Sequence, residues 1–167
     1  MKTGFSLGSN MGGRLRQLTQ AKTLLLLDPH VKFVDQSLVY ETEPVDVKEA
    51  YRQMKFLNAV LVVDSPYTAE EWLLKIKRVE EALKRERTDD RNAPRTIDVD
   101  ILFSGDEIVD NDLLQIPHPR WPERRFVVAP LADVCPERVL PGEECTVRKI
   151  LEQMPENDDV RLFAEKW

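Results

Sequence analysis

The sequence predicts an α+β fold in which an antiparallel sheet carries helices on one face. Over residues 1–104, segments with the two-residue period of strands alternate with segments that have the 3.6-residue period of helices. Their order is strand, helix, strand, strand, helix, strand, which is the split βαβ, ferredoxin-like βαββαβ arrangement. We expect an added hairpin and C-terminal helices to cover the rest of the sheet.

The composition is that of one globular domain. The chain has 167 residues, of which 42% are hydrophobic and 32% charged, and we expect a single domain over residues 1–167. The net charge of −6 argues against nucleic acid as a main partner. No apolar run approaches the ~20 residues that would span a bilayer, and no signal peptide is visible. Cys135 and Cys145 fit no metal-ligand pattern, so we expect free thiols and a cytoplasmic location.

Local patterns predict the first helix and the strands around it. Residues 2–7 form an apolar strand, and Asn10 is predicted to cap the helix that follows, because its side chain can accept from free amide groups. β-Branched and aromatic residues predict a strand over residues 31–42. The charged, proline-bearing residues 43–53 predict a loop. The apolar stripe of the helix consists of Leu15, Leu18, Ala21 and Leu25.

The next strand and helix have the clearest signals in the chain. Residues 56–64 form a nearly continuous apolar run, which predicts a buried strand. Thr68 and Glu71 form a capping box that begins a helix. Glu80 falls on the flank of its apolar stripe, where the carboxylate is either an ordinary edge residue or a partly shielded functional group. The stripe consists of Trp72, Leu73, Ile76, Val79 and Leu83.

The second half of the chain predicts more irregular structure. Residues 84–92 lack an apolar anchor and are predicted to form a mobile loop. Residues 104–109 contain a turn signal and a short strand, which together predict a hairpin. A helix is expected to begin near Glu123, with Pro130 as a kink or a break. A final helix is predicted over residues 147–154, and the tail beyond it shows no clear pattern.

Two aspartates lie two residues apart within an apolar strand. Because a strand alternates its faces, Asp98 and Asp100 point to one side, and the apolar side chains between them point to the other. Two ionised carboxylates on one face repel each other, and a divalent cation removes that repulsion. Carboxylate oxygens suit Mg²⁺, which completes its octahedron with water and substrate phosphates. The pattern therefore indicates metal–phosphate chemistry, although by itself it fits a solvated strand face equally well.

Basic side chains gather near these aspartates in an otherwise acidic chain. Arg85, Arg87 and Arg95 precede them, and guanidinium groups match phosphate oxygens in a bidentate way. Arg85 and Arg87 alone equally fit the basic end of a solvated helix, whereas Arg95 follows a proline that restrains its backbone. His118 lies between two prolines with Arg124 nearby, where it either donates to a nucleotide phosphate or has a structural role.

Five sequence blocks resemble, in order and approximate spacing, the 6-hydroxymethyl-7,8-dihydropterin pyrophosphokinase family of folate synthesis. The most specific block is residues 91–102, Arg-Asn-Ala-Pro-Arg-Thr-Ile-Asp-Val-Asp-Ile-Leu. The other blocks are Gly8-Ser9-Asn10, Tyr40-x-Thr42, Phe56-Leu57-Asn58-Ala59, and Pro117-His118 followed by Arg124-x-Phe126. The similarity covers nearly the whole chain, while Asn92 and Pro119 stand where many members carry an aromatic residue.

The resemblance implies a fold, an activity and a set of site residues. Family members are ferredoxin-like with extra elements, transfer the pyrophosphoryl group of ATP to the pterin hydroxymethyl group and release AMP. The implied cofactor is a pair of Mg²⁺ ions with ATP as co-substrate, and the implied state is a monomer. The implied site residues are Arg85, Arg95, Asp98 and Asp100 for catalysis, with Asp98 and Asp100 as metal ligands; Glu80, Arg87, His118 and Arg124 for ATP; and Thr42, Phe56, Asn58 and Phe126 for the pterin.

Two other functions fit the same residues. A Mg²⁺-dependent phosphohydrolase would use the same carboxylates and release phosphate from ATP without pterin. A non-catalytic ferredoxin-like regulator would bind ligand and form no AMP, since this fold hosts many functions. The acceptor of the hydroxyl proton is also open between Asp100 and the metal-bound environment.

Overall fold

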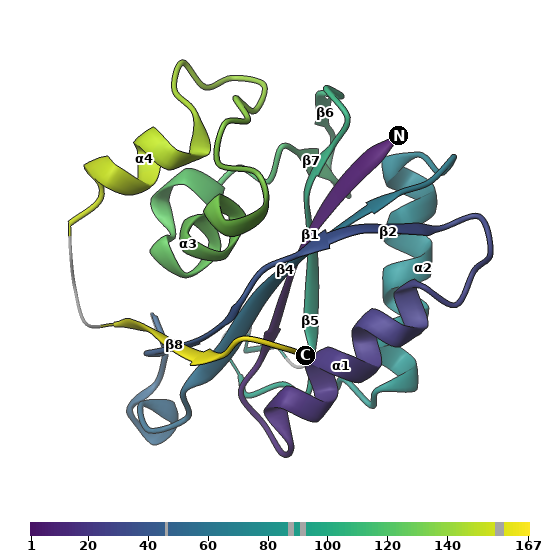
Figure 1. Ribbon diagram of the computed structural model, residues 1–167. Coiled ribbons are helices and arrows are strands. Elements are labelled where there is room, and N and C mark those ends of the chain that lie inside the picture. The colour runs from purple at the N-terminus through teal and green to yellow at the C-terminus, as the bar shows by residue number, and fades with distance from the viewer. Residues whose placement is uncertain (46, 87–88, 91–92, 156–158) are drawn as a thin grey trace.

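In the computed structural model, helices cover both faces of a central antiparallel sheet (Figure 1). The structure describes residues 1–167 except 46, 87–88, 91–92 and 156–158. Within the described residues, six strands join in the order β5-β1-β4-β3-β8, with β2 also pairing with β4. The strands are β1 (Lys2–Ser9), β2 (Lys32–Gln36), β3 (Val39–Thr42), β4 (Phe56–Asp64), β5 (Asp98–Ser104) and β8 (Val160–Ala164).

Two helices pack on each side of the sheet. On one face, α1 (Arg14–Leu25) and α2 (Ala69–Ala82) bury a core around Phe5, Leu7 and Trp72. On the other face, α3 (Arg125–Val134) packs on β4, and α4 (Val147–Gln153) packs on α3 around Trp121 and Val128. Short 3₁₀ turns occur at η1 (Glu49–Tyr51) and η2 (Trp121–Glu123).

The ferredoxin-like prediction is confirmed, with one strand divided. The segment predicted as a single strand over residues 31–42 forms β2 and β3, which both pair with β4. Ser37 causes the division, because its backbone N–H donates to the Val60 carbonyl and its hydroxyl accepts from the Val60 N–H. A side chain thus replaces one rung of the ladder, and the chain shifts before β3 begins.

One helix prediction is wrong, and of the kink or break expected at Pro130 the structure excludes the break. Asn10 does not cap α1: Gly13 occupies the N-cap without a side-chain hydrogen bond, and the Asn10 side chain bonds elsewhere. Pro130 lies inside α3 without ending it. The capping box of Thr68 and Glu71 is confirmed at the start of α2. No helix in the described part of the chain is long and apolar enough to cross a membrane.

The hairpin prediction is half right. Gly105 makes the expected turn with a positive φ of 53°. The short strand after it, β6 (Val109–Asp110), pairs with β7 (Gln115–Ile116) in a separate two-stranded sheet and not with β5. The C-terminal tail, for which the sequence pattern gave no prediction, contains β8, which pairs with β3.

Candidate active site

The strand register sets the predicted pterin and metal residues in one row across the sheet. Asn58 of β4 is the register partner of Gly8 in β1, and Gly8 is the partner of Asp98 in β5. Tyr40 of β3 continues the row on the other side of Asn58. Partners in an antiparallel pair point to the same face. An amide and a carboxylate therefore share the α3 face, with a residue that has no side chain between them.

Gly8 is required at this point by close approach. A Cβ on Gly8 would lie 3.0 Å from Asn58 Oδ1 and 3.7 Å from Phe56 Cδ1. Asn58 is buried, and its amide Nδ2 donates to Thr42 Oγ1 across 2.6 Å. That bond leaves the Asn58 carbonyl, its second N–H and the Thr42 hydroxyl hydrogen for a ligand. These groups suit the alternating donors and acceptors along the edge of a polar heterocycle.

Asp98 is the centre of a charged cluster at the start of β5. Arg85, just after α2, donates from Nη1 to Asp98 Oδ1 at 2.5 Å and also binds the Glu80 carboxylate. Arg95 donates to Asp98 Oδ2 at 2.6 Å. Glu80 is buried and accepts the Val99 backbone N–H, so its interpretation as an ordinary edge residue is wrong. The cluster joins α2 to the edge of β5.

Asp100 carries the most perturbed carboxyl of the cluster. Burial and the neighbouring Asp98 raise the pKa of Asp100 to about 7, because both disfavour its ionised form. Burial alone would lower the pKa of Arg85, but Asp98 and Glu80 outweigh it and raise that pKa. A carboxyl whose charged form is disfavoured in this way is a site where a cation would be favoured.

The residues present fit a hard divalent cation. Asp98 and Asp100 offer oxygen ligands on one face of β5, and burial together with Asp98 raises the pKa of Asp100, an effect that a bound cation would oppose. Among the described residues, no group of three or more His, Cys, Asp or Glu side chains converges as a metal cage. Mg²⁺ is commonly bound through one or two carboxylates plus substrate phosphates.

Asn10 was predicted to cap the first helix, but in the structure it supports the candidate active site. Its backbone N–H donates to the Arg95 carbonyl at 3.3 Å, and its Oδ1 accepts the Arg95 N–H at 2.8 Å. These two bonds fix the segment before β5 against the end of β1. The block Gly8-Ser9-Asn10 was the available signal, but the helix-capping interpretation competed with it.

His118 and Arg124 approach the cluster from the loop after β7. The His118 N–H donates to the Leu102 carbonyl at 3.0 Å, which fastens the loop to the outer edge of β5. His118 Nδ1 accepts the Arg120 N–H, so a neutral ring carries its proton on Nε2 and is a donor there. Burial and Arg124 lower the pKa of His118, which keeps the ring neutral at pH 7.

An arginine guanidinium group lies over the ring of each aromatic residue in the predicted site. Arg95 lies over Phe56 with 6.0 Å from Cζ to the ring centroid, and Arg124 lies over Phe126 at 5.7 Å. Both rings are half-buried. Arg87, the remaining predicted residue, lies outside the described residues, as do parts of the predicted loop 84–92.

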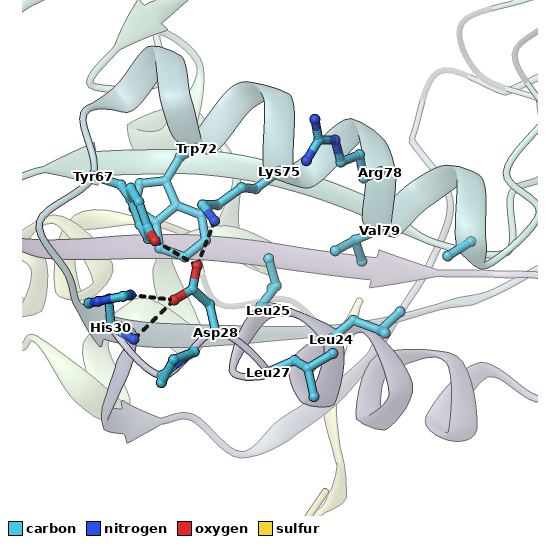
Figure 2. Close-up of a pocket in the computed structure, with 12 residues that line it drawn as sticks. Leu24, Leu25, Leu27, Asp28, His30, Tyr67, Trp72, Lys75, Arg78 and Val79 are labelled. Atoms are coloured by element: carbon cyan, nitrogen blue, oxygen red, sulfur yellow. Dashed lines mark hydrogen bonds and ion pairs between the residues drawn. The ribbon is translucent and has the colours of Figure 1, made fainter.

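A cavity of about 690 Å³ lies away from this cluster, between the end of α1 and α2 (Figure 2). None of the predicted site residues lines it. At one end, Asp28 accepts from Tyr67 Oη at 2.6 Å and from Lys75 Nζ at 2.8 Å, and it also binds His30. Lys75 and Tyr67 hold the pKa of Asp28 well below its usual range. The cluster fastens the end of α1 to α2.

Comparison with protein families gives a match over most of the chain. Residues 4–136 match the model of the 7,8-dihydro-6-hydroxymethylpterin-pyrophosphokinase family. A 2-amino-4-hydroxy-6-hydroxymethyldihydropteridine pyrophosphokinase from Bacillus subtilis is 39% identical over 130 residues, which is 78% of this chain and 75% of that protein. The protein of the same name from Methylorubrum extorquens is 36% identical over 148 residues, or 89% of this chain and 90% of the relative.

Longer proteins contain a similar region. A folate synthesis bifunctional protein from Arabidopsis thaliana is 40% identical over 129 residues. The aligned region covers 77% of this chain but only 26% of that protein. In a folic acid synthesis protein from Pneumocystis carinii, the chain spans 20% of the relative's length. The HPPK-DHPS structure from Plasmodium falciparum with pterin and p-hydroxybenzoate has a TM-score of 0.71 at 17% identity, covering 91% of this chain and 41% of that one, which shows a shared fold.

Proposed function

The chain belongs to the 7,8-dihydro-6-hydroxymethylpterin-pyrophosphokinase family, and we propose that it transfers the pyrophosphoryl group of ATP to 6-hydroxymethyl-7,8-dihydropterin in folate synthesis. The products are AMP and the pterin diphosphate. The observation that carries the proposal is the row Asn58–Gly8–Asp98, which sets an amide suited to a pterin edge beside a carboxylate suited to metal-bound phosphates.

The proposed step is a displacement at phosphorus. The hydroxymethyl oxygen of the pterin attacks the β-phosphorus of ATP, and the bond from that phosphorus to the α-phosphate bridging oxygen breaks. AMP leaves with the bridging oxygen, and the attacking hydroxyl gives up its proton to Asp100 or to the metal-bound environment. Such reactions need little covalent participation by protein, so positioning and charge stabilisation do most of the catalysis.

Asp98 and Asp100 are the proposed ligands of two Mg²⁺ ions. When bound, these ions neutralise phosphate charge and orient the pyrophosphoryl group for in-line attack. The carboxylates of the chain contribute the oxygen ligands and a shielded strand face. The raised pKa of Asp100 supports this role, because a cation there would favour the ionised form.

Arg85 and Arg95 are proposed to exchange partners when substrate binds. In this structure both guanidinium groups compensate Asp98. Once the carboxylate binds a cation, the arginines become available for phosphate oxygens, which they match in a bidentate way. The same side chains thus compensate Asp98 and, in the proposed step, would stabilise the charge that develops in the transition state.

The nucleotide and pterin sides are assigned to different elements. Glu80, His118 and Arg124 are proposed to contact ATP, and the Nε2–H of the neutral His118 ring supports a role as phosphate donor. Arg87 is proposed for the same side. The Thr42–Asn58 pair is proposed to recognise the pterin edge, while Phe56 and Phe126 enclose its ring faces.

One assay separates this proposal from its two rivals. Purified protein is incubated with ATP, Mg²⁺ and 6-hydroxymethyl-7,8-dihydropterin, and AMP, ADP and phosphate are followed. The proposal expects AMP only when pterin is present. Pterin-independent phosphate release would instead indicate a phosphohydrolase, and ligand binding without AMP would indicate a regulator.

Asp98→Asn and Asp100→Asn make the same assay specific to the site. Each variant should keep the fold, because the substitutions are isosteric, yet lose turnover by about 100-fold or more, as for the removal of key charge stabilisers. Near-normal AMP release by either variant would exclude the carboxylates as metal ligands.

We further propose that the protein is a monomer that acts in the cytoplasm. Its two unpaired cysteines support that location, because reducing conditions keep thiols free.

A further inference from the structure

The strand that carries Thr42 is held from outside the predicted site. Strand β3 is only four residues long and lies between β4 and β8. On its outer side it pairs with β8, from Thr42 opposite Val160 to Val39 opposite Ala164. The Glu43 N–H adds a bond to the Asp159 carbonyl at 3.1 Å. Without β8, the strand that positions Thr42 would be an exposed edge.

Arg14 contacts two strands and the start of a third from the opposite face of the sheet. From the start of α1, its Nη2 binds Glu41 Oε2 at 2.8 Å, and its Nη1 donates to the Lys55 carbonyl at 2.8 Å. Its guanidinium carbon lies 5.7 Å from the ring centroid of Phe163 in β8, within cation–π range. One side chain therefore contacts β3, the residue before β4, and β8.

These contacts flank the proposed pterin residues along the chain. Glu41 is the neighbour of Thr42, and Lys55 is the neighbour of Phe56. Thr42 and Phe56 are themselves register partners. Because adjacent residues of a strand point to opposite faces, Arg14 holds the backbone behind the pterin residues without touching their side chains.

Trp167 makes a second contact that restrains the start of β3. Trp167 donates from its indole Nε1 to the Ser37 carbonyl at 2.8 Å, just before β3. On α1, Lys22 binds the Trp167 carbonyl and lies 4.6 Å from the indole centroid. In Figure 1 the C-terminus lies beside α1, on the side of the sheet opposite α3. Strand β8 also lies beyond residues 4–136, the stretch that matches the family model.

We propose that Arg14, with Phe163 of β8, is a positioning residue that sets the affinity of this protein for the pterin and not for ATP. The inference rests on the proposed function, because it assumes that Thr42 and Asn58 recognise the pterin edge. The nucleotide residues that the structure describes lie on α2 and after β7, whereas the Arg14 partners lie on β3, before β4 and on β8. Loss of the Arg14 contacts should therefore weaken binding of the pterin and leave binding of ATP unchanged.

The test compares Arg14→Ala and Phe163→Ala with a matched control, Arg16→Ala, which removes an exposed arginine two residues along the same helix. Steady-state AMP formation gives KM for each substrate and kcat. We expect KM for the pterin to rise about fivefold to twentyfold, below the roughly hundredfold cost of gross misplacement. KM for ATP and kcat should stay within about twofold, and Arg16→Ala should match the parent protein.

Three further measurements make the result specific. Arg14→Lys keeps the charge for Glu41 but not the fork that also reaches Lys55, so it should restore pterin KM only in part. The double variant Arg14→Ala/Phe163→Ala should cost less than the product of the single effects, because both side chains act through one contact. Hydrogen exchange of the β3 amides should quicken in Arg14→Ala and not in Arg16→Ala.

The outcomes distinguish this inference from the proposed function. If the parent protein forms no AMP from ATP and pterin, the proposed function fails. If the parent is active but Arg14→Ala keeps a normal pterin KM, or loses ATP and pterin equally, the positioning role is wrong. A change in exchange rates without a change in pterin KM would also overturn it, since it would make the contact purely structural.

Discussion

Replacing Arg95 by alanine should have opposite effects on magnesium binding and on turnover. Arg95 donates to Asp98 Oδ2 at 2.6 Å, and the two side chains are only 16% and 24% exposed. A cation that binds Asp98 must displace this charge-assisted bond. Hydrogen bonds to charged groups contribute about 1.5–3 kcal/mol, and about 1.4 kcal/mol corresponds to tenfold in affinity. Arg95→Ala should therefore bind Mg²⁺ about tenfold to hundredfold more tightly in the absence of ATP.

Turnover should fall in the same variant. If Arg95 moves to the phosphates once substrate binds, its loss removes a transition-state stabiliser and lowers kcat by about 100-fold to 1000-fold. Calorimetric titration with Mg²⁺ alone measures the first effect, and AMP formation measures the second. Arg78→Ala, an exposed arginine on α2, is the control and should change neither. Unchanged or weaker Mg²⁺ binding by Arg95→Ala would refute the exchange of partners.

Three other predictions follow from particular contacts. Gly8→Ala should raise pterin KM severalfold with little effect on ATP, because the new Cβ would lie 3.0 Å from Asn58 Oδ1; Gly13→Ala, whose Cβ meets only ordinary contacts, is the control for the kinetic assay. Mg²⁺ affinity should fall by up to about tenfold per pH unit as pH drops below about 7, because Asp100 must lose its proton to bind, and Asp100→Asn should flatten that dependence in calorimetry. Asp28→Asn should lower the melting temperature at neutral pH. Because the pKa of Asp28 is depressed in the folded protein, the stabilisation by its carboxylate is present above the unfolded pKa of about 3.9 and is lost as the pH falls below that value. A difference in melting temperature that persists undiminished at the most acidic pH would contradict this account.

The predictions that succeeded depend on local chemistry. The capping box of Thr68 needs only residues three apart, and the alternation around Asp98 needs only the strand repeat. Asn10 failed for the opposite reason: a helix cap and a tertiary bond to Arg95 use the same side-chain oxygen, and local sequence cannot rank them. The turn at Gly105 was predicted correctly, but the pairing of the short strand after it was not, because its partner, β7, lies further along the chain.

The sequence by itself determined the order of the elements, the shared face of Asp98 and Asp100, and the identity of the basic residues near them, because strand and helix periods are properties of neighbouring residues. Only the tertiary structure decided that Asn58, Gly8 and Asp98 lie in one row, that Glu80 is buried against Arg85, and that the C-terminal strand supports Thr42. These facts depend on register and on pairing between distant segments, which the packing of the whole chain fixes.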